Sequence, residues 1–352
     1  MMSARIFSFR WGIATLTAIL ALGGLRAESV PRVEVSKIRR VFHNGEHNAF
    51  TDLIRFQGRF YLTFRSCPEG HGVHDSASII VLSSADAESW EQVYRFSVEK
   101  RDTRDPHFLI FRDQLFIYSG TWYDDPSGQF DLNQHLGYGV YTSDGLNWAP
   151  PTILQGTFGH YVWKAAAFGG KAYLCGRRKT NYAVGPKGEG KAVRSVMLES
   201  SDGLIWRQRA FFQTEAGDET VFCFEEDGSI IAIGRRGSDT AQLCRARAPY
   251  QEWQRSDLDH YIGGPLLSRW GNRWVVGGRK FTQSRGPKTS FYWLKNGNLE
   301  EFAELPSAGD NSYPGFVELS STRALISWYS SHEKDDRGNP MTAIYLAELR
   351  LP

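Results

Sequence analysis

The segment Ser200-Ser201-Asp202-Gly203-Leu204-Ile205-Trp206 contains a short phrase that recurs along this chain at a fixed interval. Two earlier copies read Thr142-Ser143-Asp144-Gly145-Leu146-Asn147-Trp148 and Ser84-Ala85-Asp86-Ala87-Glu88-Ser89-Trp90. The tryptophans are 58 residues apart in both intervals (206 − 148 and 148 − 90). One such turn in every ~40–60 residues is typical of a β-propeller in which each blade contributes one copy.

Each copy has the composition of a tight turn. The Asp side chain can accept hydrogen bonds from backbone N–H groups across the loop, and Gly adopts a positive φ without steric cost. The Trp fills the space between neighbouring sheets. Ala87 replaces the Gly in the first copy, and a more distant fourth copy spans residues 247–253. Because unrelated surface turns would not share one spacing, the repeat favours a propeller.

Six segments share a second pattern, in which a polar start, an apolar strand, a two-residue turn and another apolar strand follow one another. This pattern predicts six β-hairpins. Their turns are Gln57-Gly58, Asp113-Gln114, Gly169-Gly170, Asp227-Gly228, Gly271-Asn272 and Ser321-Thr322. A strand over residues 33–42 can pair with residues 343–349, which would close the ring and remove an exposed edge. The sequence therefore predicts an all-β fold, a six-bladed β-propeller with four-stranded antiparallel blades.

The first 27 residues have the features of a cleavable signal peptide. Arg5 and Arg10 precede an apolar run over residues 11–25, which is short for a membrane span, and Ala27 offers a small residue for cleavage. No second hydrophobic span follows. We therefore expect one propeller domain over residues 28–352, in a secreted or periplasmic protein.

Composition excludes some partners and leaves the cysteines open. The net charge is +2, without a basic tail or a basic-aromatic stripe, which argues against nucleic acid. No motif calls for a cofactor or a metal. The four cysteines lack metal-binding spacing. Cys175 and Cys223 fall on strands of adjacent predicted blades, which allows one disulfide, with buried free thiols as the alternative.

Aligning the hairpins brings polar residues to one end of the ring. The start of the first strand and the end of the second lie at the same end of an antiparallel hairpin. A ring of guanidinium groups there suits bidentate capture of a carboxylate or sulfate, although a solvated strand end is the alternative for any single arginine. Counting nine residues back and seven forward from each turn collects Asp105, Glu219, Tyr161, Tyr313, Arg65, Arg177, Arg235 and Arg279.

These features resemble the sialidase (neuraminidase) superfamily over nearly all of the expected mature chain. Its Asp-box turns, also called BNR repeats, mark the fold and are silent on activity. The run from Glu219 to Gly228, followed by Arg235, is similar to the sialidase segment that pairs the catalytic Glu with a triad arginine. Gly277-Gly278-Arg279 sits where the next triad arginine is expected, and Ser312-Tyr313-Pro314-Gly315 resembles the segment of the nucleophilic tyrosine. Asp75 occupies the place of the acid/base aspartate.

The resemblance implies an exo-acting, retaining glycoside hydrolase acting on an acidic terminal sugar, sialic acid or another. Tyr313 would attack the anomeric carbon while Glu219 takes its proton, and Asp75 would protonate the leaving oxygen and then activate water. Tyrosine-nucleophile sialidases are an exception to the two-carboxylate scheme. Arg235 and Arg279 would hold a substrate carboxylate.

One departure concerns the first inner strand. Sialidases carry an Arg-Ile-Pro motif there, whereas this chain reads His47-Asn48-Ala49-Phe50-Thr51-Asp52. We hypothesise that Arg65 reaches the same end of the pocket from the second strand. Further candidates for sugar binding are Asp52, Asp105, His71 and Trp163; His71 could also replace Asp75 as the acid.

Two alternatives remain open. A carbohydrate-binding propeller without catalysis would tolerate loss of the family arginine. A polysaccharide lyase acting on uronic acids would use Tyr313 or a histidine to abstract a proton beside a carboxylate neutralised by arginine.

Overall fold

The computed structural model describes Met1 and residues 31–128, 130–182 and 192–352. The expected signal peptide over residues 1–27 therefore lies outside the described residues, apart from Met1. Residues Pro31–Pro352 form one compact unit. Within the described ranges, no helix has the length and apolar character needed to cross a membrane.

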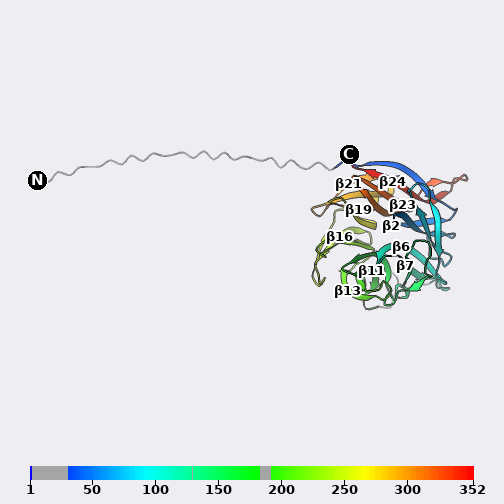
Figure 1. Cartoon of the computed structure of the whole chain (residues 1–352), viewed down its shortest axis with the longest axis horizontal. Helices are drawn as coiled ribbons and strands as arrows, with labels where there is room; N and C mark the ends of the chain where they lie inside the picture. The colour runs from blue at the N-terminus through cyan, green and yellow to red at the C-terminus, as the bar shows by residue number, and fades with distance from the viewer. Residues whose placement is uncertain (2–30, 129, 183–191) are drawn as a thin grey trace. The chain divides into compact units, whose positions relative to one another are not determined.

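The compact unit is a six-bladed β-propeller. Its six sheets each contain four antiparallel strands, and Figure 1 shows the blades following one another in chain order around the ring. In blade 1 the strands are β2 (His47–Phe56), β3 (Arg59–Cys67), β4 (Ser78–Ser84) and β5 (Glu91–Phe96). In blade 2 they are β6 (Arg101–Phe111), β7 (Gln114–Tyr123), β8 (Leu136–Thr142) and β9 (Thr152–Ile153). In blade 3 they are β10 (Tyr161–Phe168), β11 (Lys171–Lys179), β12 (Val193–Ser200) and β13 (Arg207–Gln213).

The remaining blades continue the same order. In blade 4 the strands are β14 (Thr220–Phe224), β15 (Ile230–Arg236), β16 (Asp239–Ala246) and β17 (Trp253–Asp257). In blade 5 they are β18 (Gly263–Trp270), β19 (Arg273–Thr282), β20 (Gly286–Lys295) and β21 (Asn298–Glu304). In blade 6 they are β22 (Asn311–Ser320), β23 (Arg323–Lys334), β24 (Pro340–Arg350) and β1 (Glu34–Phe42). Two short 3-10 helices, η1 (Leu132–Gln134) and η2 (Thr180–Tyr182), lie in connections.

Blade 6 combines strands from both ends of the unit. β1 pairs antiparallel with β24, so that Val35 lies opposite Leu349 and Arg40 opposite Tyr345. This confirms the predicted closure of the ring. Closure leaves no open gap between the first and last blades, where an unpaired edge would otherwise invite association.

Four of the six predicted hairpin turns are confirmed, one is shifted by one residue, and one lies inside a longer loop. In blade 2 Phe111 pairs with Gln114, so the turn is Arg112-Asp113 rather than Asp113-Gln114. Both turn residues have positive φ (51° and 59°), as a type I′ hairpin turn requires. In blade 4 the loop covers residues 225–229, because Asp227 accepts a hydrogen bond from the Ser229 N–H (2.8 Å) and widens the turn.

The repeated turns have the geometry that their composition predicts. In the third copy Asp202 Oδ1 accepts hydrogen bonds from the N–H groups of Leu204 and Ile205, both at 2.8 Å. The first two copies form the same pair of bonds. The residue three before each Trp is left-handed in all four copies, namely Ala87, Gly145, Gly203 and Tyr250.

These turns also join neighbouring blades. A Cβ at Gly145 would lie 1.8 Å from the hydroxyl of Tyr61 in blade 1, and one at Gly203 would lie 2.9 Å from the hydroxyl of Tyr118 in blade 2. Tyr118 donates its hydroxyl proton to the Gly203 carbonyl (3.0 Å). Glycine is thus needed at these two positions for close approach as well as for its φ.

The cysteines are not cross-linked. Cys67, Cys175, Cys223 and Cys244 are all free thiols, and three of them are buried. The disulfide considered between Cys175 and Cys223 is therefore absent. Cys175 instead lies 3.4 Å from the Ser195 hydroxyl, and the Cys223 thiol lies 3.5 Å from the Leu267 carbonyl.

Candidate active site

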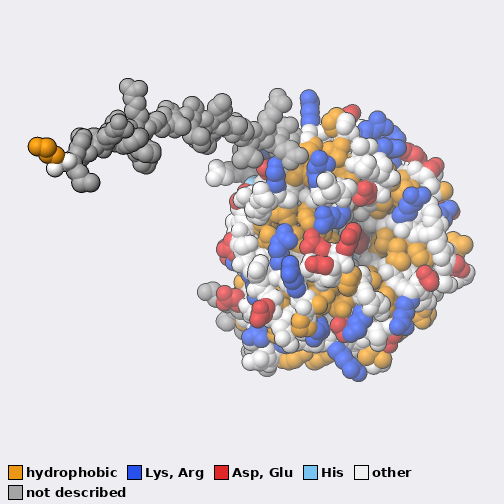
Figure 2. All heavy atoms as spheres, turned by 60° about the vertical axis from the view of Figure 1, so that its left-hand side comes forward, with side chains coloured by type: hydrophobic (Ala, Val, Ile, Leu, Met, Phe, Trp, Pro, Cys, Tyr) orange, Lys and Arg blue, Asp and Glu red, His pale blue; other side chains and the backbone are white. Residues whose placement is uncertain are grey.

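The inner hairpins bring their polar ends to one end of the ring, as the alignment predicts. Ala49 lies opposite Arg65, Tyr161 opposite Arg177, and Gly263 opposite Arg279. In blade 4 the Arg235 N–H donates to the Glu219 carbonyl at 2.9 Å. Figure 2 shows one face of the protein, on which acidic side chains gather beside a hollow among basic and hydrophobic ones.

Bulges shape the innermost strands at this end. In five blades the pairing with the second strand shifts just after the strand begins. Four residues at or beside these shifts have left-handed backbone, with φ between 49° and 63°: Phe50, Asp105, Gly264 and Tyr313. For a residue with a side chain this conformation costs about 1–3 kcal/mol and is concentrated at functional sites. The bulges therefore aim side chains that regular strands would place elsewhere.

Tyr313 and Glu219 form the central pair of the site. The Tyr313 hydroxyl donates to Glu219 Oε1 at 2.6 Å. Glu219 Oε2 accepts from Arg235 Nη1 (3.2 Å) and from the Gly264 N–H (3.0 Å), so that three donors converge on one buried carboxylate. This arrangement holds the carboxylate oriented toward the phenol.

Electrostatics assigns a proton state to each partner. Burial opposes ionisation of Glu219, but the charge of Arg235 and the hydrogen bond from Tyr313 lower its pKa below the usual range. Burial and the charge of Glu219 raise the pKa of Tyr313 well above that of a free phenol. Glu219 is thus an ionised acceptor and Tyr313 a neutral donor, which is the resting state that a general base and its nucleophile require.

Asp218 binds the two arginines next to this pair. It forms ion pairs with Arg177 Nη1 and, at 3.5 Å, with Arg235 Nε. Arg177 also lies over the Tyr161 ring at 5.1 Å, and Arg235 over the Tyr261 ring at 5.7 Å. The alignment missed Asp218, although it directly precedes Glu219 in the sequence.

Arg279 lies on the other side of Tyr313. Its Nε donates to the Asn311 carbonyl (2.9 Å), and Nη2 lies 3.0 Å from the Tyr329 hydroxyl and 3.3 Å from Asp310 Oδ1. The guanidinium is 5.7 Å from the centre of the Tyr313 ring. Arg235 and Arg279 therefore flank the phenol, and each already has a protein carboxylate as partner.

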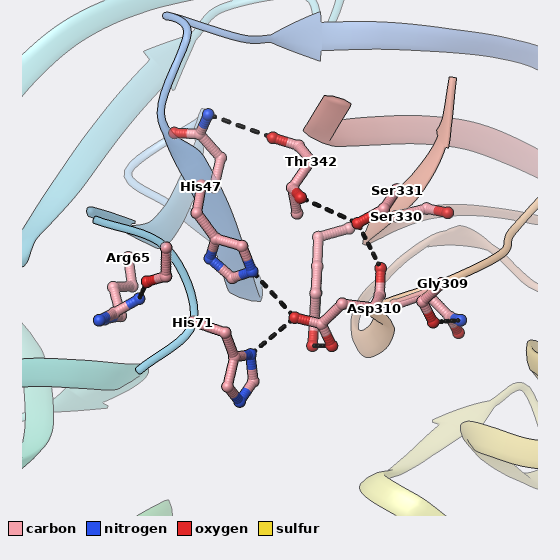
Figure 3. Close-up of polar contacts among 12 residues, drawn as sticks. His47, Arg65, His71, Gly309, Asp310, Ser330, Ser331 and Thr342 are labelled. Atoms are coloured by element: carbon pink, nitrogen blue, oxygen red, sulfur yellow. Dashed lines mark hydrogen bonds and ion pairs between the residues drawn. The ribbon is translucent and has the colours of Figure 1, made fainter. Parts of the chain in front are cut away.

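Asp310 is the centre of a second cluster, drawn in Figure 3. Its Oδ2 accepts from His47 Nε2 (2.9 Å) and His71 Nδ1 (2.7 Å), and its Oδ1 accepts from the Tyr329 hydroxyl (2.8 Å). Burial disfavours the charge, but the hydrogen bonds from both histidines and the charge of Arg279 lower the Asp310 pKa well below its usual range. Sequence reasoning named His71 alone from this cluster.

Asp105 is a buried carboxyl group that feels the charge of Glu219. Tyr161 donates its hydroxyl proton to Asp105 Oδ2, while Oδ1 is buried without a hydrogen-bond partner among the described residues. Burial raises the pKa of Asp105 to about 8; the charge of Arg104 opposes this rise and that of Glu219 adds to it. A carboxyl that is protonated at neutral pH can donate its proton to a sugar oxygen.

Arg65 does not face the site, in contrast to the hypothesis drawn from the first strand. Its side chain is 0% exposed and pairs with Asp102, with Nε at 2.9 Å from Oδ1 and Nη2 at 3.0 Å from Oδ2. Nη1 and Nη2 also donate to the carbonyls of Gly70 and Gly72 (2.9 Å each). With these donors engaged and no exposed surface, Arg65 positions a loop rather than a substrate.

Asp52 and Trp163 are likewise enclosed by protein. Asp52 accepts from Lys164 Nζ (2.6 Å) and the Phe108 N–H (2.9 Å), and it is 3% exposed. Burial works against its charge, but Lys164 and His107 lower its pKa below the usual range. Trp163 is also buried, edge-on to the Tyr313 ring at 5.3 Å, so it forms a wall behind the phenol instead of an open stacking surface.

Asp75 is exposed on the loop between β3 and β4. Its backbone N–H donates to Asp124 Oδ2 (3.1 Å), directly after β7 of blade 2. Its side chain takes no part in the network around Tyr313 and Glu219 among the described residues.

Solved structures share this architecture at low sequence identity. No family model and no curated protein matches the sequence. A protein of unknown function from Dyadobacter fermentans superposes with a TM-score of 0.72 at 17% identity, over 92% of this chain and 100% of that one. Trypanosoma rangeli sialidase, in complex with the inhibitor DANA, gives a TM-score of 0.65 at 11% identity, over 89% of this chain and 60% of that one.

Phage phi92 endosialidase gives a TM-score of 0.66 at 9% identity, over 90% of this chain and 69% of that one. The chain spans about three fifths of the length of the Trypanosoma enzyme. At these identities the likeness concerns the backbone path. The chain has the six-bladed propeller fold of the sialidases, in a divergent form.

Proposed function

We propose that this protein is an exported, exo-acting glycoside hydrolase that cleaves a terminal sugar with retention, through a tyrosine nucleophile. The observation that supports this most directly is the 2.6 Å hydrogen bond from Tyr313 to Glu219, a carboxylate held by Arg235 and the Gly264 N–H. A phenol activated by an adjacent base is a competent nucleophile.

In the first step the Tyr313 oxygen bonds to the anomeric carbon, the glycosidic C–O bond breaks, and the phenol proton passes to Glu219. The leaving oxygen takes a proton from an acid/base residue, a role that the sequence resemblance gives to Asp75. In the second step water attacks the same carbon and gives one proton to the acid/base residue, while Tyr313 leaves and regains its proton from Glu219. A neutral nucleophile avoids bringing a carboxylate up to an anionic sugar.

Arginine and carboxyl groups point to a polar, acidic sugar as substrate. Arg235 and Arg279 flank Tyr313 and would hold a substrate carboxylate, and the protonated Asp105 would bind a hydroxyl. Sialic acid and uronic acids both have this chemistry.

The decisive experiment is hydrolysis of aryl glycosides, including sialic acid and uronic acid conjugates, by the wild-type protein and Tyr313→Phe. Release of one sugar by the wild type, lost in Tyr313→Phe, is expected. Tyr345→Phe is the matched control, since Tyr345 is also buried but lies in β24 and is not a partner in the hydrogen bonds that hold Glu219. An equal loss in both variants would contradict a nucleophilic role.

One observation favours a second function, glycan binding without catalysis. Arg177, Arg235 and Arg279 all have protein carboxylates as partners, so the site is electrostatically satisfied without substrate. Glycan binding together with no product from any conjugate would support this function. An unsaturated product absorbing in the ultraviolet would instead indicate a lyase.

A further inference from the structure

The loop that follows β3 presents one histidine to solvent beside the nucleophile. The His71 side chain is 55% exposed, whereas Tyr313 and Glu219 are buried. The His71 ring lies against Phe50, with ring centres 5.5 Å apart, and Phe50 lies against Tyr313 at 4.9 Å. A single aromatic ring thus separates the histidine from the phenol.

The backbone around His71 is clamped by two buried guanidinium groups. Arg104 Nη2 donates to the carbonyls of His71 (3.0 Å) and Gly72 (2.6 Å), and Arg65 donates to Gly70 and Gly72. Both arginines pair with the fully buried Asp102. This loop is therefore preorganised, as a catalytic side chain requires.

The side chain of His71 is oriented by Asp310. Because an ionised carboxylate only accepts hydrogen bonds, His71 must present Nδ1–H to Oδ2. Nε2 is then the ring nitrogen that can give or take a proton, and Figure 3 shows this nitrogen pointing away from Asp310. Asp310 is itself held by Tyr329 and Arg279, so the carboxylate holds the imidazole in one orientation.

The surroundings of His47 argue against a metal ion in this cluster. His47, His71 and Asp310 place three potential ligand atoms within 4.8 Å of one another. A metal on His47 Nε2 would move the proton to Nδ1, which is buried and has no partner among the described residues. Metal-bound histidines nearly always donate that second N–H to an acceptor. Hydrogen bonding to Asp310 through Nε2–H avoids this cost.

We propose that His71, rather than Asp75, is the acid/base residue of the hydrolase, and that Asp310 is its positioning residue. The assignment rests on the proposed function. As the glycosidic bond breaks, the Nε2 proton of His71 passes to the leaving oxygen. In the second step Nε2 accepts a proton from the attacking water, while Tyr313 departs and recovers its proton from Glu219.

The test compares leaving groups of different acidity on the sugar identified by the panel. A 2,4-dinitrophenyl glycoside needs little protonation on departure, whereas a methyl glycoside needs it fully. For His71→Ala we expect a ~10²–10⁴-fold loss of kcat/KM on the methyl glycoside, a small change on the dinitrophenyl glycoside, and recovery of turnover with azide. Asp310→Asn should weaken the same step and show the same dependence on the leaving group, because the imidazole loses the carboxylate that orients it.

His74→Ala is the matched control, because His74 lies on the same loop and donates its backbone N–H, not its ring, to Asp102 Oδ2 (3.3 Å). If Asp75→Ala shows the leaving-group signature and His71→Ala does not, the assignment to His71 is overturned. Activity that depends on added Zn²⁺ and is abolished by chelation would also overturn it, in favour of a metal at the same residues. Absence of hydrolysis by the wild type on every conjugate would overturn the proposed function and this assignment together.

Discussion

Gly264 lies so close to Tyr313 that a Cβ at position 264 would be 2.6 Å from the edge of the phenol ring. The N–H of the same glycine donates to Glu219, the partner of that phenol. One residue therefore supports the nucleophile through its missing side chain and the base through its backbone.

Gly264→Ala should displace Tyr313 from Glu219. The substitution adds a left-handed alanine, which costs roughly 1–2 kcal/mol, together with a clash against the ring. We expect loss of most hydrolytic activity and a lower melting temperature. Gly286→Ala is the control, since Gly286 also has positive φ (67°) but open space around its Cβ position. If Gly264→Ala and Gly286→Ala were equally active, the clash with the Tyr313 ring would not be a cause of lost activity.

Glu219→Gln should keep the fold and remove the base. The amide is nearly isosteric, and Arg235 retains Asp218 as an ionic partner. We expect kcat to fall by ~10²–10⁴-fold, the usual contribution of general acid–base catalysis. Glu225→Gln, in the loop between β14 and β15 of the same blade, is the control and should hydrolyse at the wild-type rate. Wild-type turnover by Glu219→Gln would remove the glutamate from the mechanism.

Asp105 should make the protein less stable as pH rises. Its pKa is about 8 in the folded state against an ordinary value of 3.8. Between these values the folded state holds the extra proton, so the free energy of unfolding falls with rising pH, by up to about 1.4 kcal/mol per pH unit from this group. Asp105→Asn should flatten the dependence of the melting temperature on pH between about 5 and 8.

The exposed Asp125 supplies the control for that experiment. Its pKa is lowered by hydrogen bonds from Ser127, so it stays ionised across the same pH range. Asp125→Asn should leave the slope of melting temperature against pH as it is in the wild type. A wild-type slope in Asp105→Asn would mean that Asp105 is ionised in the folded protein.

Arg65→Met should destabilise the fold strongly. Removing one partner of a buried ion pair costs ~3–5 kcal/mol, and the lower end applies because Arg104 still faces Asp102. Arg59 lies in the same strand as Arg65 and forms an exposed ion pair with Glu91. Arg59→Met should lower the free energy of unfolding by only about 0–1 kcal/mol. Chemical unfolding of the two variants measures the difference. Similar free energies of unfolding would show that Arg65 is not a buried clamp.

Local patterns carried most of the fold. The 58-residue spacing and the hairpin turns depend on a strict repeat or on residues near one another, and the structure confirms the six blades. The same alignment brought Glu219, Tyr313, Arg235 and Arg279 to one end of the ring. Strand alternation and antiparallel pairing suffice for this placement.

Side-chain direction was the part that local patterns could not supply. Arg65 and Arg279 hold matching positions in their hairpins, yet Arg65 is fully buried against Asp102 while Arg279 reaches Tyr313. Bulges near Phe50 and Tyr313 redirect the strands, and the sequence patterns did not predict them. Asp310 went unnoticed, although it stands three residues before Tyr313, as Asp102 stands three before Asp105.

By itself, the sequence determined the blade number and the end of the ring at which chemistry gathers, because strands and tight turns are set by neighbouring residues. Only the tertiary structure decided which charges pair. The bonds from Asp310 to His47 and His71 join residues 263 and 239 positions apart, and Tyr313 reaches Glu219 across 94. Such contacts exist only once the ring has closed, because each partner comes from a different blade.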